Sequence, residues 1–199
     1  MRHYWLIQMY RGKLSDEQSQ FFKARPAEQL FDLSEDPHEV NDVSGHSDKQ
    51  DILSELREKL QRKVKAINDL SFYPESHMID RALKNPLAFG QDHSEEINKL
   101  VDVADLALHS FQKAMPKLVK IFQNGTEWEK YWASMVCSQF GLKAKPLSSH
   151  LKKMLSSKNL MLRMRAIEAL ALTEKIDPMP SRFLCSQSLF GRLCFGNPF

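Results

Sequence analysis

The side chains best suited to chemistry gather in one short stretch, SEDPHEVNDV, at positions 34–43. Counted with one aspartate just before it, the carboxylate, amide and imidazole groups are those of Asp32, Glu35, Asp36, His38, Glu39, Asn41 and Asp42. Oxygen ligands at this density are typical of calcium sites, which also need a mid-loop glycine and a terminal bidentate glutamate. Here Pro37 occupies the middle and Gly45 comes too late. Because Asp and Asn side chains also accept hydrogen bonds from nearby backbone amides, the stretch favours a turn before a helix over a metal site.

The remaining motifs give no catalytic set. The seven histidines form no His-x-x-x-His pair, and the spacing of Glu35 and His38 crosses a proline instead of following a helix face. There is no Gly-x-Ser-x-Gly elbow, phosphate-binding Gly-rich loop or dinucleotide fingerprint. No Cys-x-x-Cys pair exists among the three cysteines, Cys137, Cys185 and Cys194. We therefore predict no catalytic, cofactor-binding or metal-binding residue, and no cofactor, in this chain.

Basic and aromatic residues in the last third invite a nucleic-acid interpretation. Trp128, Tyr131 and Trp132 have lysines nearby, and LKKMLSSK is a basic run. At helical spacing, however, aromatic residues more often form a core or groove, and a charge run is usually a solvated helix face. The net charge of +3 is also too small to indicate a nucleic acid or a membrane as partner.

Length and composition describe a folded, helix-rich chain. Its 199 residues have room for one domain or two small ones, and its 42% hydrophobic and 27% charged residues argue against global disorder. Seven glycines are few for a protein of strands and turns. No apolar run approaches the roughly 20 residues of a transmembrane helix, and the start, MRHYWLIQMYRGK, lacks the features of a signal peptide. The localisation is unknown from the sequence.

The acidic turn lies between a predicted strand and a predicted helix. EQLFDL, at residues 28–33, is the best strand candidate, and upstream Ser15 and Gln18 have the spacing of a capping box. The helix, DKQDILSELREKLQRKVKAI, carries an apolar face at period 3.6, formed by Ile52, Leu53, Leu56, Leu60, Val64 and Ile67. A single strand cannot cover that face, so the N-terminal third is predicted to be part of something larger.

An internal repeat with an offset of 33 residues occupies the last third. KLVKIFQNGTEWEKYWASMVC, from Lys117, aligns with HLKKMLSSKNLMLRMRAIEAL, from His150. Apolar positions keep their phase, the matched pairs being Leu118 with Leu151, Ile121 with Met154, Phe122 with Leu155, Ala133 with Ala166 and Val136 with Ala169. A two-helix period of this length is typical of α-solenoids, in which each helix pair buries its face on its neighbour. It resembles short HEAT-type repeats.

The strand, turn and helix also carry a family resemblance. PAEQLFDLSEDPHEVNDV resembles the closing segment of type I sulfatases, with its signature P-x-E-E-L-Y-D-L-x-x-D-P-x-E-x-N-N-L. Matching positions are Pro26, Glu28, Leu30, Asp32, Leu33, Asp36, Pro37, Glu39 and Asn41. Departures are Gln29, Phe31, Asp42 and Val43. The flanking RGKLSDEQSQFFKARPAEQ and DLSFYPESHMI look like stretches of a bacterial subgroup that has a HEAT-like helical extension.

This resemblance implies a parent enzyme that hydrolyses sulfate esters, with sulfated polysaccharides as a candidate substrate. Such enzymes use a formylglycine made in a Cys/Ser-x-Pro-x-Arg motif, beside a calcium ion. The nearest match here, PMPSR at 178–182, has proline where the nucleophile belongs. The resemblance therefore carries over no catalytic or metal residue, and the calcium site and catalytic core are expected outside this chain.

The predicted fold is mainly α: a small α+β sulfatase C-terminal piece, with one or two strands plus a helix, followed by α-α hairpin (HEAT-like) repeats. The predicted divisions are a sulfatase C-terminal subdomain fragment at 1–70, a linker with a short helix at 71–94, HEAT-like helical repeats at 95–176 and an irregular tail at 177–199. The predicted function is that of a C-terminal sulfatase fragment, inactive alone, whose partner is the missing sulfatase core. The alternative is a stand-alone helical-repeat module that binds a protein partner.

Overall fold

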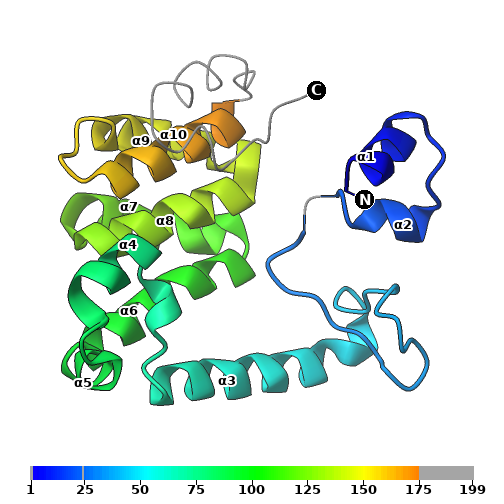
Figure 1. The fold of residues 1–199 in the computed structure, drawn as a ribbon, viewed down its shortest axis with the longest axis horizontal. Coiled ribbons are helices and arrows are strands. Elements are labelled where there is room, and N and C mark those ends of the chain that lie inside the picture. Colours follow the sequence, from blue (N-terminus) through cyan, green and yellow to red (C-terminus); the bar gives the residue numbers. More distant parts are fainter. Residues whose placement is uncertain (1, 24, 175–199) are drawn as a thin grey trace. The chain divides into compact units, whose positions relative to one another are not determined.

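The structure, a computed structural model, describes residues 2–23 and 25–174 (Figure 1). The tail predicted at 177–199, with its two cysteines and the PMPSR stretch, lies outside the described residues. Within those two ranges the chain is helical and has no β-strand, which confirms the prediction of a mainly α protein. The chain divides between Gln61 and Arg62 into two compact units, here called the N-terminal unit and the helical unit.

The N-terminal unit consists of short helices joined by turns. Its elements are α1 (Arg2–Tyr10), α2 (Asp16–Gln20), the single turn η1 (Ser47–Lys49) and most of α3 (Gln50–Ala66). The predicted capping box at the start of α2 is confirmed. The Ser15 hydroxyl accepts a hydrogen bond from the Gln18 N–H at 3.3 Å, and the Ser15 N–H donates to the Gln18 side chain at 3.1 Å. These bonds satisfy two of the amides that a helix start leaves unpaired.

The strand predicted at 28–33 is wrong for the described residues. Leu30 bonds to the returning arm of the loop at one point only: its carbonyl accepts from the Val43 N–H at 2.8 Å, and its N–H donates to the Asp42 carboxylate at 3.0 Å. A side chain thus takes the place of the second backbone partner that a ladder requires. Without a neighbouring strand, the apolar alternation of this segment does not produce a sheet.

The helical unit starts within α3 and continues to α10 (Figure 1). Its first part contains η2 (Leu70–Phe72), α4 (Glu75–His77), the π-turn η3 (Met78–Ala82) and α5 (Pro86–Asp92). The rest consists of α6 (Ser94–Ala104), η4 (Asp105–Leu108), α7 (Phe111–Asn124), α8 (Glu127–Phe140), η5 (Gly141–Leu147), α9 (Ser148–Met154) and α10 (Leu160–Glu174). The linker predicted at 71–94 contains α4, η3 and α5, all of them short.

The 33-residue offset recurs in the helix positions. α8 begins at Glu127 and α10 at Leu160, 33 residues later, and the matched residues Leu118 and Leu151 are both 0% exposed. The matched pair Phe122 and Leu155 differs most clearly, because Phe122 is 9% exposed and Leu155 is 40% exposed. α9 ends at Met154, before the position equivalent to the end of α7, so Leu155 lies beyond the helix. The HEAT-type classification itself stays a prediction.

Most of the apolar face of α3 is exposed. Leu53 is buried, whereas Ile52, Leu56, Leu60 and Ile67 are between 46% and 65% exposed. Within the N-terminal unit, the other described residues do not cover Ile52, Leu56 or Leu60, although the periodicity of this helix predicts a buried face.

Candidate functional site

The acidic turn uses its carboxylates to hold its own backbone. Asp36 accepts hydrogen bonds from the N–H groups of Val40 and Asn41, at 2.8 and 2.7 Å. Asp42 accepts in the same way from Leu30 and Ser44, at 3.0 and 2.9 Å. This is the role predicted from the sequence, in which short acidic side chains replace backbone partners in a tight turn.

Hydrogen bonding also sets the charge state of this turn. Bonds from the Ser34 side chain and from Lys49 lower the pKa of Asp32. Burial opposes ionisation of Asp42, but the hydrogen bonds from Leu30 and Ser44 outweigh it and lower the pKa of this carboxyl as well. Among residues 2–23 and 25–174, no three His, Cys, Asp or Glu side chains are placed to share a metal ion.

Two ion pairs connect the turn to α3 and its lead-in. Lys49 Nζ lies 3.2 Å from the Asp32 carboxylate, and Arg57 Nε donates to the Glu28 carboxylate at 2.9 Å. A second guanidinium nitrogen of Arg57 contacts the other Glu28 oxygen, which makes the pair bidentate. Bidentate pairs fix orientation as well as distance, so the segment before the turn is aligned with the middle of α3.

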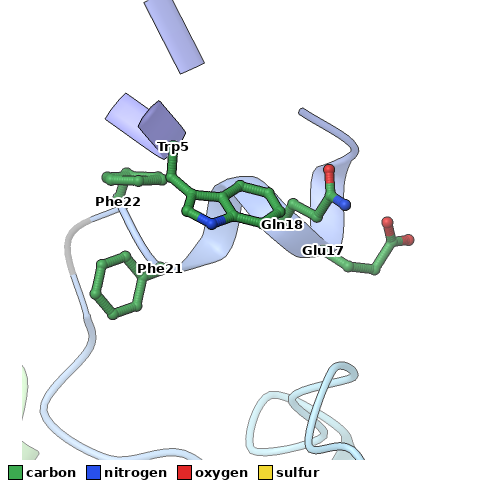
Figure 2. Close-up of a pocket in the computed structure, with 5 residues that line it drawn as sticks. All are labelled: Trp5, Glu17, Gln18, Phe21 and Phe22. Atoms are coloured by element: carbon green, nitrogen blue, oxygen red, sulfur yellow. The ribbon is translucent and has the colours of Figure 1, made fainter. Parts of the chain in front are cut away.

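A groove in the N-terminal unit lies between α1 and α2 (Figure 2). It has a volume of about 560 Å³ and is lined by Trp5, Glu17, Gln18, Phe21 and Phe22. Figure 2 shows the three aromatic side chains gathered on one side of α2, with the Glu17 carboxylate directed away from them. The lining therefore offers apolar contact and holds no pair of groups suited to acid–base chemistry.

The helical unit holds a second cluster that the sequence did not predict, built from aromatic rings and histidines. The ring of His77 lies 5.0 Å from that of Tyr73 and 4.7 Å from that of Trp128. Phe89 stacks on His93 at 3.9 Å. These residues come from α4, α5, α8 and the connecting segments, so no local motif could have indicated the cluster.

A tyrosine–glutamate hydrogen bond lies at the centre of this cluster. Tyr73 is 2% exposed, and its hydroxyl donates to the Glu96 carboxylate at 2.6 Å. Burial and the neighbouring carboxylate raise the pKa of Tyr73, so the phenol stays protonated. Burial lowers the pKa of His77, although the Glu96 charge opposes this shift. The pair is suited to holding the segment between η2 and α4 against α6, and it offers no deprotonated tyrosine as a nucleophile or base.

We expect the cluster to make the stability of the helical unit depend on pH. The folded state lowers the pKa of His77 below the value of about 6.5 that it has in an unfolded chain. The unfolded chain therefore binds more protons, and the free energy of unfolding falls as the pH drops from 7 to 5.5. The charged groups near His77 are Glu96 and Asp80, which favour its protonation, and Arg81 and His93, which oppose it.

Urea unfolding at a series of pH values measures this effect. The His77→Gln variant should show a weaker loss of stability between pH 7 and 5.5 than the parent chain. The matched control is His109→Gln, because His109 is exposed. Equal slopes in the parent and in the His77→Gln variant would contradict the assignment.

The aromatic residues that invited a nucleic-acid interpretation belong to the core, as predicted. Tyr131 is 5% exposed, and the Arg165 guanidinium lies over its ring at 5.0 Å. Trp132 donates from its indole nitrogen to the Phe72 carbonyl at 2.8 Å. In the part of the chain that the structure describes, no helix is long and apolar enough to cross a membrane.

Comparison with known proteins gives one informative relative. No protein-family model and no solved structure matches the chain. Over 71 residues, 35% of its length, the chain is 41% identical to the ulvan-active sulfatase of Formosa agariphila. This chain is similar to a sulfatase over part of its length. The match covers 12% of that relative, and it supports a sulfatase-family origin.

Proposed function

We propose that this chain is the C-terminal part of a sulfatase-family sulfuric ester hydrolase and does not turn over sulfate esters by itself. The partial identity to the ulvan-active sulfatase supports the family. The 199 residues contain no Cys/Ser-x-Pro-x-Arg motif from which a formylglycine could be made. The described residues also place no three His, Cys, Asp or Glu side chains where they could share a metal ion.

The apolar face that α3 exposes within the N-terminal unit supports this proposal. Leu56 and Leu60, one helical turn apart, are 46% and 65% exposed. Burying two leucines against a partner would contribute about 3 kcal/mol or more at the usual value per buried side chain. The proposed partner is the catalytic core of the sulfatase, whose surface would cover Ile52, Leu56, Leu60 and Ile67.

Activity measurements on an aryl sulfate test this function in two steps. The purified chain should show no turnover above that of buffer. A chimaera in which this chain replaces the C-terminal part of the ulvan-active sulfatase should be active, and Leu56→Asp with Leu60→Asp should abolish that activity by preventing docking. The control pair is Leu83→Asp with Leu87→Asp, which changes two exposed leucines outside α3.

Two results would contradict the proposal. Enzyme-like turnover by the purified chain would place a complete catalytic site within it. If the chimaera with Leu56→Asp and Leu60→Asp were as active as the control chimaera with Leu83→Asp and Leu87→Asp, α3 would not dock on the catalytic core.

The alternative, a stand-alone helical module that binds a protein, is favoured by one observation. The helical unit has its own buried core, in which Leu118, Ala133, Leu147, Leu151 and Ala166 are all 0% or 1% exposed. A unit of this kind can fold without the N-terminal unit. A fragment from Arg62 onward that unfolds cooperatively and captures a saturable protein partner would raise this alternative above the first.

A further inference from the structure

α7 presents three lysines in one row on its outer surface. Lys113, Lys117 and Lys120 are exposed and follow the spacing i, i+4, i+7, which places them within an arc of about 60° on the helix. The opposite side of α7 carries the buried residues Ala114 and Leu118. The lysine row therefore points away from the core of the helical unit.

The elements beside α7 extend this basic character. η5 adds Lys143 and Lys145, and α9 adds Lys152 and Lys153, all of them exposed; the Lys152 charge is compensated by the Glu174 carboxylate of α10, 2.8 Å from its Nζ. The Phe122 ring of α7 stacks on His150 of α9 at 5.7 Å, so the two helices are neighbours. α7, η5 and α9 together contain seven lysines and no aspartate or glutamate.

The small net charge of the whole chain hides this segregation. Residues 69–105 contain eight acidic and three basic side chains, whereas residues 106–158 contain nine lysines and two glutamates. A basic segment thus follows an acidic one along the helical unit. A partner that binds this segment interacts with its local positive charge, and the net charge of +3 of the whole chain does not describe that interaction.

Helix stability does not account for the lysine row. Lys113 lies in the first turn of α7, where the helix dipole disfavours a cation. Lys117 follows it at i+4 and repels it. Among residues 2–23 and 25–174, no carboxylate pairs with Lys113, Lys117 or Lys120, whereas Lys65 and Lys152 have carboxylate partners. These unfavourable charge interactions lower the local stability of α7. Lysines kept at such a cost are typical of a surface that binds a charged partner.

We propose that Lys113, Lys117 and Lys120 form a binding surface for a sulfated polysaccharide, with η5 and α9 supplying further cations. This inference rests on the proposed function, because a sulfatase acts on sulfate esters and the relative acts on ulvan. The Cβ atoms of lysines one helical turn apart lie about 5–6 Å from each other, so the three side chains form a linear series of positive charges. The surface would hold the chain of the substrate at a distance from the site that cleaves it.

The composition of the exposed face favours a polysaccharide over other polyanions. Besides the lysines, the outer face of α7 presents Gln112, Pro116, Gln123 and Asn124, with no aromatic residue and no arginine, and η5 adds one exposed leucine, Leu142. Single-stranded nucleic acids bind to aromatic platforms on which bases stack, and a membrane-bound helix needs large apolar side chains next to its lysines. Amide groups beside lysines instead suit the hydroxyl and sulfate groups of a sugar chain.

Binding to dextran sulfate, with unsulfated dextran as reference, tests the proposal on the full chain. The triple variant K113Q/K117Q/K120Q should bind dextran sulfate about tenfold more weakly at 100 mM salt, and with a shallower salt dependence, because three ionic contacts are lost. The matched control, K63Q/K84Q/K99Q, removes the same charge from exposed lysines outside α7 and should bind like the parent. Circular dichroism should show equal helix content in all three proteins.

Several results would overturn the assignment. If both triple variants bound dextran sulfate equally more weakly than the parent, the loss would come from net charge and not from the α7 surface. Absence of binding to dextran sulfate by the parent, or equally tight lysine-dependent binding to duplex DNA or to phosphatidylserine vesicles, would exclude a surface for sulfated polysaccharide. Because these measurements involve no catalysis, their failure leaves the outcome of the chimaera experiment unchanged, and the two proposals fail separately.

Discussion

Replacing Trp132 by alanine is expected to lower the free energy of unfolding of the helical unit by about 3 kcal/mol. The indole packs against both buried clusters of this unit. Its nitrogen donates to the Phe72 carbonyl at 2.8 Å, and its ring lies 4.9 Å from the Phe72 ring. Truncation would remove apolar contact on two sides and leave the Phe72 carbonyl without this partner. Urea unfolding followed by circular dichroism measures the loss.

A second substitution separates the ring from the hydrogen bond. Trp132→Phe keeps most of the apolar contact and loses the donor, so it should cost about 1–2 kcal/mol. Phe72→Ala combined with Trp132→Ala should cost less than the sum of the two single variants, because both remove the same contact. Additive losses, or a loss below about 1 kcal/mol for Trp132→Ala, would contradict a linking role for Trp132.

Local sequence signals predicted local structure well. The spacing of Ser15 and Gln18 predicted a capping box, and both of its hydrogen bonds are present. The 33-residue offset found in the sequence recurs in the starts of α8 and α10, Glu127 and Leu160. Such signals succeed because the interacting groups lie within a few residues of each other, or because the same apolar pattern has to bury the same face twice.

Features that depend on distant residues were not predicted. The strand at 28–33 has suitable composition, but a strand is defined by its neighbour, and the described residues provide none. The cluster of Tyr73, His77 and Trp128 joins segments more than 50 residues apart, and no periodicity connects them. The lysine row on α7 was visible as composition, yet only burial shows that it faces outward as one surface.

The apolar face of α3 lies between these two cases. Periodicity identified its residues correctly, since a stripe at period 3.6 marks one side of a helix. Periodicity says nothing about what covers that side. Leu60 is 65% exposed, so the rest of the N-terminal unit does not cover the stripe at this position. The exposed stripe is the basis of the docking role proposed for α3.

The second large effect is expected at the two equivalent leucines of the repeat. Leu118→Ala and Leu151→Ala should each lower the free energy of unfolding of the helical unit by about 3 kcal/mol. Both side chains are 0% exposed in the same cluster, so each truncation leaves a cavity lined by apolar groups. If the repeat is structural, equivalent positions should have similar costs, and thermal unfolding of the two variants compares them directly.

Leu87→Ala is the matched control, because Leu87 is 73% exposed and the same atoms are removed from the surface. Its cost should stay below about 0.5 kcal/mol. A large loss for Leu118→Ala beside a small one for Leu151→Ala would mean that the second helix pair is loosely attached and that the shared sequence phase does not reflect shared packing. Similar large losses would show that both pairs belong to one cooperative core, as a solenoid requires of neighbouring repeats.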